Sequence, residues 1–171
     1  MLAKLRTLRS RRAVRLAMDG LVLIVIFFAV SLWQTRSHLR GDAPAFSLRT
    51  LDGATVSTES LAGKPVLLAF WAPWCGVCKV ESRNISWVKS LVGERAHVVS
   101  VASEYENLGE VRGYVADQSV DYPVLLGGRK TARDFQVAAF PTVFFLDAEG
   151  RITGSVVGYT TTGGLLMRLL F

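Results

Sequence analysis

The sequence predicts an α/β fold of three layers around a central mixed sheet in residues 42–171. Two continuous apolar runs, PVLLAFW at 65–71 and HVVSVA at 97–102, are typical of strands covered on both faces. A stretch with helical spacing of apolar residues follows each run, and strands that alternate with helices are typical of such a sheet. Turn residues at 52–53 and 148–150 indicate a hairpin at each end of the region.

Each element is predicted from its apolar spacing and from the residues that end it. The helix after the first buried strand has apolar residues at helical spacing from Cys75 to about Val92, and Gly93 is a suitable C-cap. In chain order, the expected elements are an extended segment at 42–46, a hairpin with its return strand at 55–57, a strand at 65–71, a helix at 75–92, a strand at 97–102, a helix at 108–119, a strand at 122–126, a short helix at 130–135, a hairpin of strands at 142–147 and 151–157, and a closing helix at 163–171.

The positive charge of the chain is confined to its beginning. Residues 1–40 hold eight Lys or Arg and one acidic residue, a balance of +7, whereas residues 41–171 hold twelve Lys or Arg and thirteen acidic residues, a balance of −1. A nucleic-acid-binding domain carries its positive charge on the folded face, so no nucleic-acid partner is expected. The length suits one domain, and two cysteines exclude a disulfide-dense scaffold and a four-cysteine zinc site.

Residues 16–33 are predicted to be a single transmembrane helix that anchors the protein. They include the apolar run LVLIVIFFAV at 21–30 and end at Trp33, a typical interfacial residue. Six Lys or Arg precede this segment and two follow it closely, so the positive-inside rule makes residues 1–15 a basic cytoplasmic tail. The polar residues 34–41 are then a linker to a periplasmic domain at the inner membrane.

Three other interpretations of this N-terminal segment stay open. A cleaved signal peptide needs a small-x-small site, which Ala29-Val30-Ser31 fits loosely before the bulky Leu32 and Trp33. A twin-arginine signal is suggested by Ser10-Arg11-Arg12, in a stretch where arginine pairs arise by chance. A buried core helix is the third, and the six preceding cations argue against it.

One motif carries chemistry, Cys75-Gly76-Val77-Cys78, which follows a buried strand and opens a helix. A cysteine at a helix N-terminus faces unpaired N–H groups and the positive end of the helix dipole. Both stabilise the thiolate, which lowers the cysteine pKa from about 8.5 into the range of roughly 3.5–7.5. Cys75 is thus expected to attack a disulfide, and Cys78, one turn later, to resolve the mixed disulfide.

Two other uses of the cysteine pair were weighed against redox chemistry. A structural disulfide that closes so short a loop would constrain the unfolded chain little. Half of a metal site would need further ligands, and the only histidines are His38 and His97. The context after a buried strand favours redox chemistry, and no metal or other cofactor is expected.

The stretch FWAPWCGVC at 70–78 resembles the active site of the thioredoxin fold, whose common form is W-C-x-x-C after a buried strand. Phe140-Pro141-Thr142, before an apolar strand, resembles the cis-proline loop of that fold. The helix and strand expected at 108–126 resemble the central insertion of TlpA-like membrane-anchored thioredoxins. The basic anchor, the Gly-Val pair and the C-terminal residues 158–169 look more narrowly like the suppressor-for-copper-sensitivity D proteins.

The resemblance assigns roles to individual residues. Cys75 takes the position of the nucleophile and Cys78 that of the resolving cysteine. Pro141 would lie beside them in cis, where its missing N–H and fixed φ shape a substrate groove. The residues implied to contact the substrate are Trp74, which would shield the disulfide, Gly76, Val77, and Phe140, whose backbone would bind an extended segment by strand addition.

Glu81 is a further candidate, because TlpA-like proteins often carry a glutamate three residues after the second cysteine. A partly buried carboxylate there would accept the proton of Cys78; the alternative is a solvated glutamate paired with Arg83 or Lys79. The buried aspartate of thioredoxins proper is replaced by Ala69, and a family proline by Arg83, which puts the usual helix kink in doubt. The G-V-x-G-x-P-E loop of cytochrome-c-maturation thioredoxins is absent.

The sequence therefore predicts a membrane-anchored periplasmic thiol–disulfide oxidoreductase, a reductase or isomerase of protein disulfides. Its partners would be protein thiol or disulfide substrates and a membrane electron donor of the disulfide-reductase type. Two alternatives remain: a thioredoxin-like reductase of cytochrome c maturation, and a non-enzymatic protein that binds copper through its cysteine pair.

Overall fold

The computed structural model describes Met18, Val22 and residues 41–171 of the chain. The predicted tail at 1–15 lies outside the described residues, as do nearly all of the predicted anchor and the linker up to residue 40. Within the described residues, no helix has the length and apolar character needed to cross a membrane. The chain divides into two units, Met1–Ser37 and His38–Phe171.

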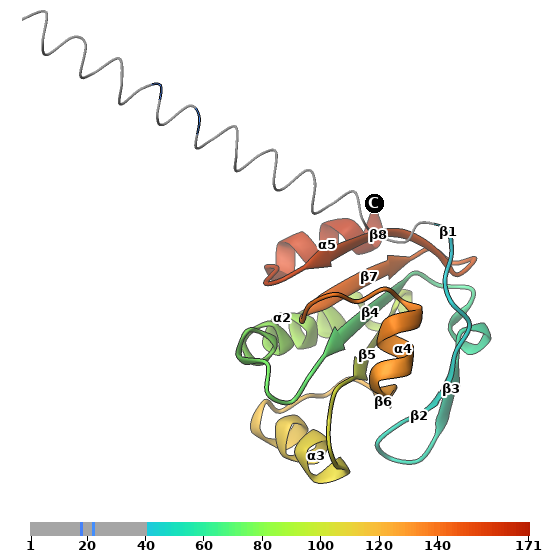
Figure 1. Cartoon of the computed structure of the whole chain (residues 1–171). Coiled ribbons are helices and arrows are strands. Elements are labelled where there is room, and N and C mark those ends of the chain that lie inside the picture. Colours follow the sequence, from blue (N-terminus) through green and yellow to red (C-terminus); the bar gives the residue numbers. More distant parts are fainter. Residues whose placement is uncertain (1–17, 19–21, 23–40) are drawn as a thin grey trace, which may run out of the picture. The chain divides into compact units, whose positions relative to one another are not determined.

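A six-stranded mixed sheet forms the centre of the domain (Figure 1). Its strand order is β1-β8-β7-β4-β5-β6; β4, β5 and β6 are parallel, and β7, β8 and β1 continue the sheet antiparallel. The bounds are β1 Gly41–Asp42, β4 Val66–Trp71, β5 His97–Ala102, β6 Val124–Leu126, β7 Thr142–Leu146 and β8 Arg151–Val157.

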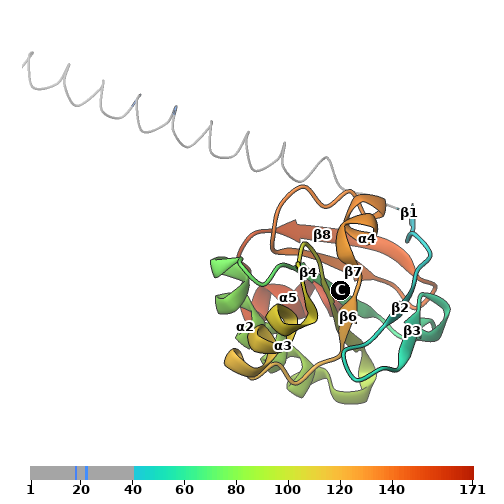
Figure 2. The same ribbon diagram turned by 60° about the horizontal axis from the view of Figure 1, so that its bottom comes forward.

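Different elements cover the two faces of the sheet, as Figures 1 and 2 show. Helices α2 (Gly76–Val92) and α5 (Thr162–Leu170) pack on one face. Helix α4 (Gly128–Asp134) and the hairpin of β2 (Ser47–Arg49) and β3 (Thr55–Ser57) cover the other. The short 3₁₀ helices are η1 (Glu59–Leu61) and η2 (Gly93–Arg95), and α3 is Leu108–Asp117. The predicted three-layer α/β fold with a mixed sheet is confirmed.

The middle strand β4 shows why its sequence is a continuous apolar run. Leu67 and Ala69 pack in the cluster under α2 and α5, whereas Leu68 and Phe70 pack in the cluster on the other face, around Phe135. Since side chains alternate across a strand, a strand covered on both faces needs apolar residues at every position.

Several elements differ in length from the prediction. Helix α3 ends at Asp117, and two residues later Ser119 has a φ of 51°. Strand β6 begins at Val124, where its pairing with Ser100 starts. Helix α4 begins at Gly128, two residues earlier than predicted. The preceding Gly127 lies close to β5, since a Cβ there would lie 2.3 Å from Val101 Cγ1.

The first strand of the sheet, β1, includes one residue that the sequence placed in the linker. Gly41, expected to be the last residue of the linker, is already part of β1 and pairs with Ile152 of β8. The next residue, Asp42, pairs with Arg151 of β8.

Candidate active site

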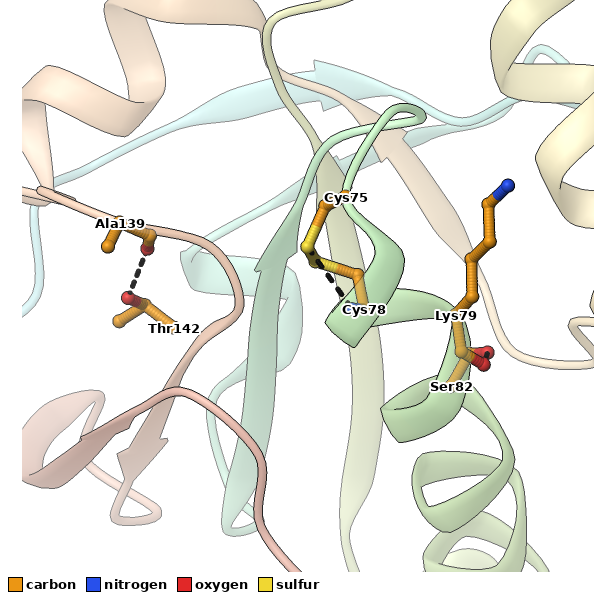
Figure 3. The surroundings of a disulfide bond; sticks show 6 residues. All are labelled: Cys75, Cys78, Lys79, Ser82, Ala139 and Thr142. Atoms are coloured by element: carbon orange, nitrogen blue, oxygen red, sulfur yellow. Dashed lines mark hydrogen bonds between the residues drawn. A yellow bond between two sulfur atoms is a disulfide. The ribbon is translucent and has the colours of Figure 1, made fainter.

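The cysteine pair lies where β4 ends and α2 begins. Cys75 is the N-cap of α2, and its Sγ accepts a hydrogen bond from the backbone N–H of Cys78 at 3.1 Å. The two cysteines form a disulfide with a Cα–Cα distance of 5.3 Å, and Figure 3 shows it at the first turn of the helix. Both side chains are buried, with exposed fractions of 5% and 2%. The N-cap bond gives Cys75 Sγ the backbone donor that a thiolate needs.

An exposed rim surrounds the buried disulfide. Trp74 is 65% exposed and Val77 47% exposed, and Gly76 between them is also exposed. Exposed apolar side chains beside a buried reactive group make a suitable contact surface for another protein.

The loop that precedes β7 faces the disulfide across the site (Figure 3). The Phe140–Pro141 peptide bond is cis, as the resemblance implied. The Thr142 hydroxyl donates to the Ala139 carbonyl at 2.7 Å, and the Gly158 N–H donates to the Pro141 carbonyl at 2.8 Å. The ring of Phe140 meets that of Trp74 edge-on, with centroids 5.9 Å apart. The structure thus brings together the two cysteines, Trp74 and the cis-proline loop.

Glu81 is buried one helical turn after Cys78. Its exposed fraction is 1%, which shows that the alternative of a solvated glutamate is wrong. Its Oε1 accepts a hydrogen bond from the Thr160 N–H at 2.9 Å, and its Oε2 is buried without a partner among the described residues. Burial disfavours the carboxylate and raises the pKa of Glu81 to about 7, against the smaller opposing effect of the Thr160 N–H.

The segment that donates to Glu81 is held by a residue that sequence reasoning missed. Asn84 Nδ2 donates to the Thr160 carbonyl at 2.8 Å, and Asn84 Oδ1 accepts from the Thr162 hydroxyl at 3.3 Å. Asn84 follows Glu81 by three residues and therefore shares its helix face, which is the one feature of the sequence that could have indicated a role for Asn84. Nothing local indicated the contact with residues 160–162.

The two cysteines are part of a buried cluster that includes the aromatic residues Trp71 and Tyr114. Trp71 stacks on Tyr114 of α3 with centroids 3.9 Å apart, and its indole N–H donates to the Ser100 hydroxyl at 3.1 Å. Burial raises the pKa of Tyr114 to about 12, against the smaller opposing effect of a hydrogen bond with Ser82, and the charge of Glu81 adds a still smaller increase. Tyr114 therefore stays neutral near neutral pH.

The structure shows the surroundings of the two residues that depart from the family pattern, Ala69 and Arg83. Ala69 is buried in β4 and brings no carboxylate, and Glu81 is the one buried acidic side chain in residues 41–171. Arg83 does not interrupt the helix, which runs unbroken from Gly76 to Val92.

The one histidine within residues 41–171, His97, lies at the opposite end of β4 from the cysteines. His97 pairs with Val66 at the start of β4, whereas the cysteines follow Trp71 at its end. Within residues 41–171, no three His, Cys, Asp or Glu side chains are grouped so as to hold a metal ion.

A disulfide at a helix N-terminus, opposite a cis-proline loop on a mixed sheet, can exchange with the thiols of another protein. This arrangement defines a thiol–disulfide oxidoreductase with a thioredoxin-like fold. The chain belongs to the Redoxin family, whose family model matches residues 39–165.

Named relatives agree with this class. The chain is 31% identical to the thioredoxin-like protein YneN of Bacillus subtilis over 149 residues, which cover 82% of this chain and 88% of YneN. It is 29% identical to the thiol-disulfide oxidoreductase ResA of the same organism, over 92% of this chain and 89% of ResA. A solved thiol:disulfide interchange protein of the thioredoxin family from Chlorobium tepidum is 29% identical, with a TM-score of 0.68 over 78% of this chain and 98% of that one.

The raised pKa of Glu81 predicts a pH-dependent stability. The folded state keeps the Glu81 proton up to about pH 7, whereas the unfolded chain releases it near 4.5. The folded state binds more protons in this window, so the Glu81 contribution to the free energy of unfolding falls as pH rises from about 4.5 to 7, by on the order of 3 kcal/mol. In urea unfolding, the free energy of unfolding of Glu81→Gln minus that of the wild type should therefore increase by this amount between pH 4 and pH 8.

The control for this comparison is Glu106→Gln, because the Glu106 side chain is exposed and forms no ion pair within residues 41–171. Its difference from the wild type should stay nearly constant over the same pH range. A constant difference for Glu81→Gln as well would contradict a buried, protonated Glu81.

Proposed function

We propose that the protein reduces or isomerises disulfides of other proteins in the periplasm, held at the inner membrane by residues 16–33. The observation that supports this most directly is the N-cap position of Cys75, with its Sγ accepting from the Cys78 N–H. A reduced Cys75 in this position is a stabilised thiolate at neutral pH, and a thiolate is the attacking species in disulfide exchange.

The proposed reduction has two steps. The Cys75 thiolate attacks one sulfur of a substrate disulfide, forms a mixed disulfide and releases the other substrate sulfur as a thiolate, which takes a proton from water. Cys78 loses its proton and attacks Cys75 Sγ, which forms the Cys75–Cys78 disulfide and releases the second substrate thiolate. Two electrons pass from the enzyme to the substrate, so a membrane electron donor of the disulfide-reductase type must reduce the enzyme again.

Glu81 is proposed to accept the proton of Cys78 in the second step. Its pKa of about 7 is suited to a proton acceptor near neutral pH. Oε1 is engaged by the Thr160 N–H, so Oε2, which is buried and free of partners in the described part of the chain, is the atom left to take the proton.

The composition of the motif supports a reductase or isomerase rather than a strong oxidant. Gly76 and Val77 bring no cation between the cysteines, and a strong oxidant needs its reduced thiolate to be exceptionally stabilised. The narrower assignment to the suppressor-for-copper-sensitivity D group is likewise a proposal, which rests on the basic tail, the Gly-Val pair and residues 158–169.

A reporter fusion tests the proposed location. A reporter that is active only outside the cytoplasm should be active when it is fused after Phe171, because the Arg-rich flank at 1–15 is retained inside. The protein should also stay in the membrane fraction after an alkaline wash. Activity of a cytoplasmic reporter at the same position would overturn the orientation, and release by alkali would indicate cleavage.

A trapping experiment tests the exchange reaction. In Cys78→Ser the helix N-terminus still stabilises the Cys75 thiolate, so the first step proceeds while the resolving thiol is missing. Mixed disulfides with substrate proteins should therefore accumulate. Purification without reductant, followed by elution with a thiol, should recover these substrates for identification.

The matched control is Cys75→Ser, which should trap far less because Cys78 lies inside the helix and is 2% exposed. If neither variant captures a partner and the wild type reduces no disulfide, the proposal of an exchange enzyme fails.

A further inference from the structure

A groove runs from the rim of the disulfide towards helix α4. Its lining includes Trp74, the residue before Cys75, and Phe140 of the cis-proline loop, whose rings meet edge-on. Two arginines of α4, Arg129 and Arg133, and residues 137–139 also line it. The groove is therefore continuous with the face on which a substrate would meet Cys75.

The two arginines are free to bind a partner. Arg129 and Arg133 are exposed, and within residues 41–171 neither lies within ion-pair distance of a carboxylate. The lysine between them is different, because Lys130 pairs with Asp134 at 2.7 Å. The groove has one acidic lining residue, Glu104, so two cations stand against one anion.

The spacing of the arginines selects the shape of the partner. Positions four apart on a helix share a face and are separated by about 6 Å along its axis. Alternate residues of an extended peptide lie on the same side and are about 6.6 Å apart. Two acidic side chains in the pattern acid-x-acid would thus reach Arg129 and Arg133 together, and guanidinium groups bind carboxylates through two parallel hydrogen bonds.

We propose that this groove recognises an extended acid-x-acid segment next to the disulfide of the substrate protein. The proposal rests on the proposed function and adds the substrate class to it. The rings of Trp74 and Phe140 contact the residues nearest the substrate cysteine, and the arginines bind the acidic residues further along. Such complementarity speeds encounter and sets which way the segment lies, more than it adds affinity.

Three disulfide peptides of one sequence test this, in which the cysteine that Cys75 attacks is flanked by Asp-x-Asp, Asn-x-Asn or Lys-x-Lys. The reduced full-length enzyme in detergent, with a small dithiol supplied to reduce it again after each turnover, should reduce the Asp peptide with the highest kcat/KM and the Lys peptide with the lowest. Arg129→Glu with Arg133→Glu should lower kcat/KM for the Asp peptide about tenfold and reverse the order. The preference should shrink at high salt, because exposed charges are screened.

The charge-matched control is Arg49→Glu with Arg112→Glu, two exposed arginines outside the groove, which should keep the wild-type order. Glu104→Gln should raise kcat/KM for the Asp peptide, because it removes the carboxylate that opposes the arginines. The same loss in the control as in the groove variant, or equal turnover of all three peptides by the wild type, would overturn the groove proposal alone. No turnover of any peptide by the wild type would contradict the reductase itself.

Discussion

The chemistry of this protein depends on one constraint, namely that α2 begins only five residues after the last residue of the buried strand β4. The strand is fixed by apolar packing on both faces, so the first turn of the helix is fixed as well. Its N-cap is Cys75, whose sulfur accepts a hydrogen bond from the Cys78 N–H in the first turn. The electrostatic effect that activates the thiol therefore comes from backbone groups, and no charged side chain is needed between the cysteines.

The same helix also carries the one acidic group of the buried interior in residues 41–171. Glu81 follows Cys78 by one turn, and its burial opposes the charged form of the carboxyl. Thr160 binds only one of its oxygens, and Asn84 keeps Thr160 in place. The carboxyl is thus held at a pKa near 7, where it can both take and release a proton.

Features carried by adjacent residues were predictable from the sequence, and features that join distant residues were not. The buried strand followed at once by Cys75 is a local pattern, and the cis bond at Pro141 followed from a resemblance on short motifs. Helical spacing placed Glu81 on the cysteine face, but its burial depends on Thr160, 79 residues away in the chain. The groove likewise joins Trp74 to residues of α4 that are distant in the sequence, so it exists only in the folded protein.

The resolution step tests the central claim, that one helix carries both the disulfide and its proton acceptor. A chromophoric thiol joined to Cys75 as a mixed disulfide is released when Cys78 attacks, and stopped-flow absorbance gives the rate. Glu81→Gln should slow this release by ~10²-fold near pH 7 and remove the dependence on a group of pKa about 7. A release rate equal to that of the wild type across pH 6–8 would contradict the account.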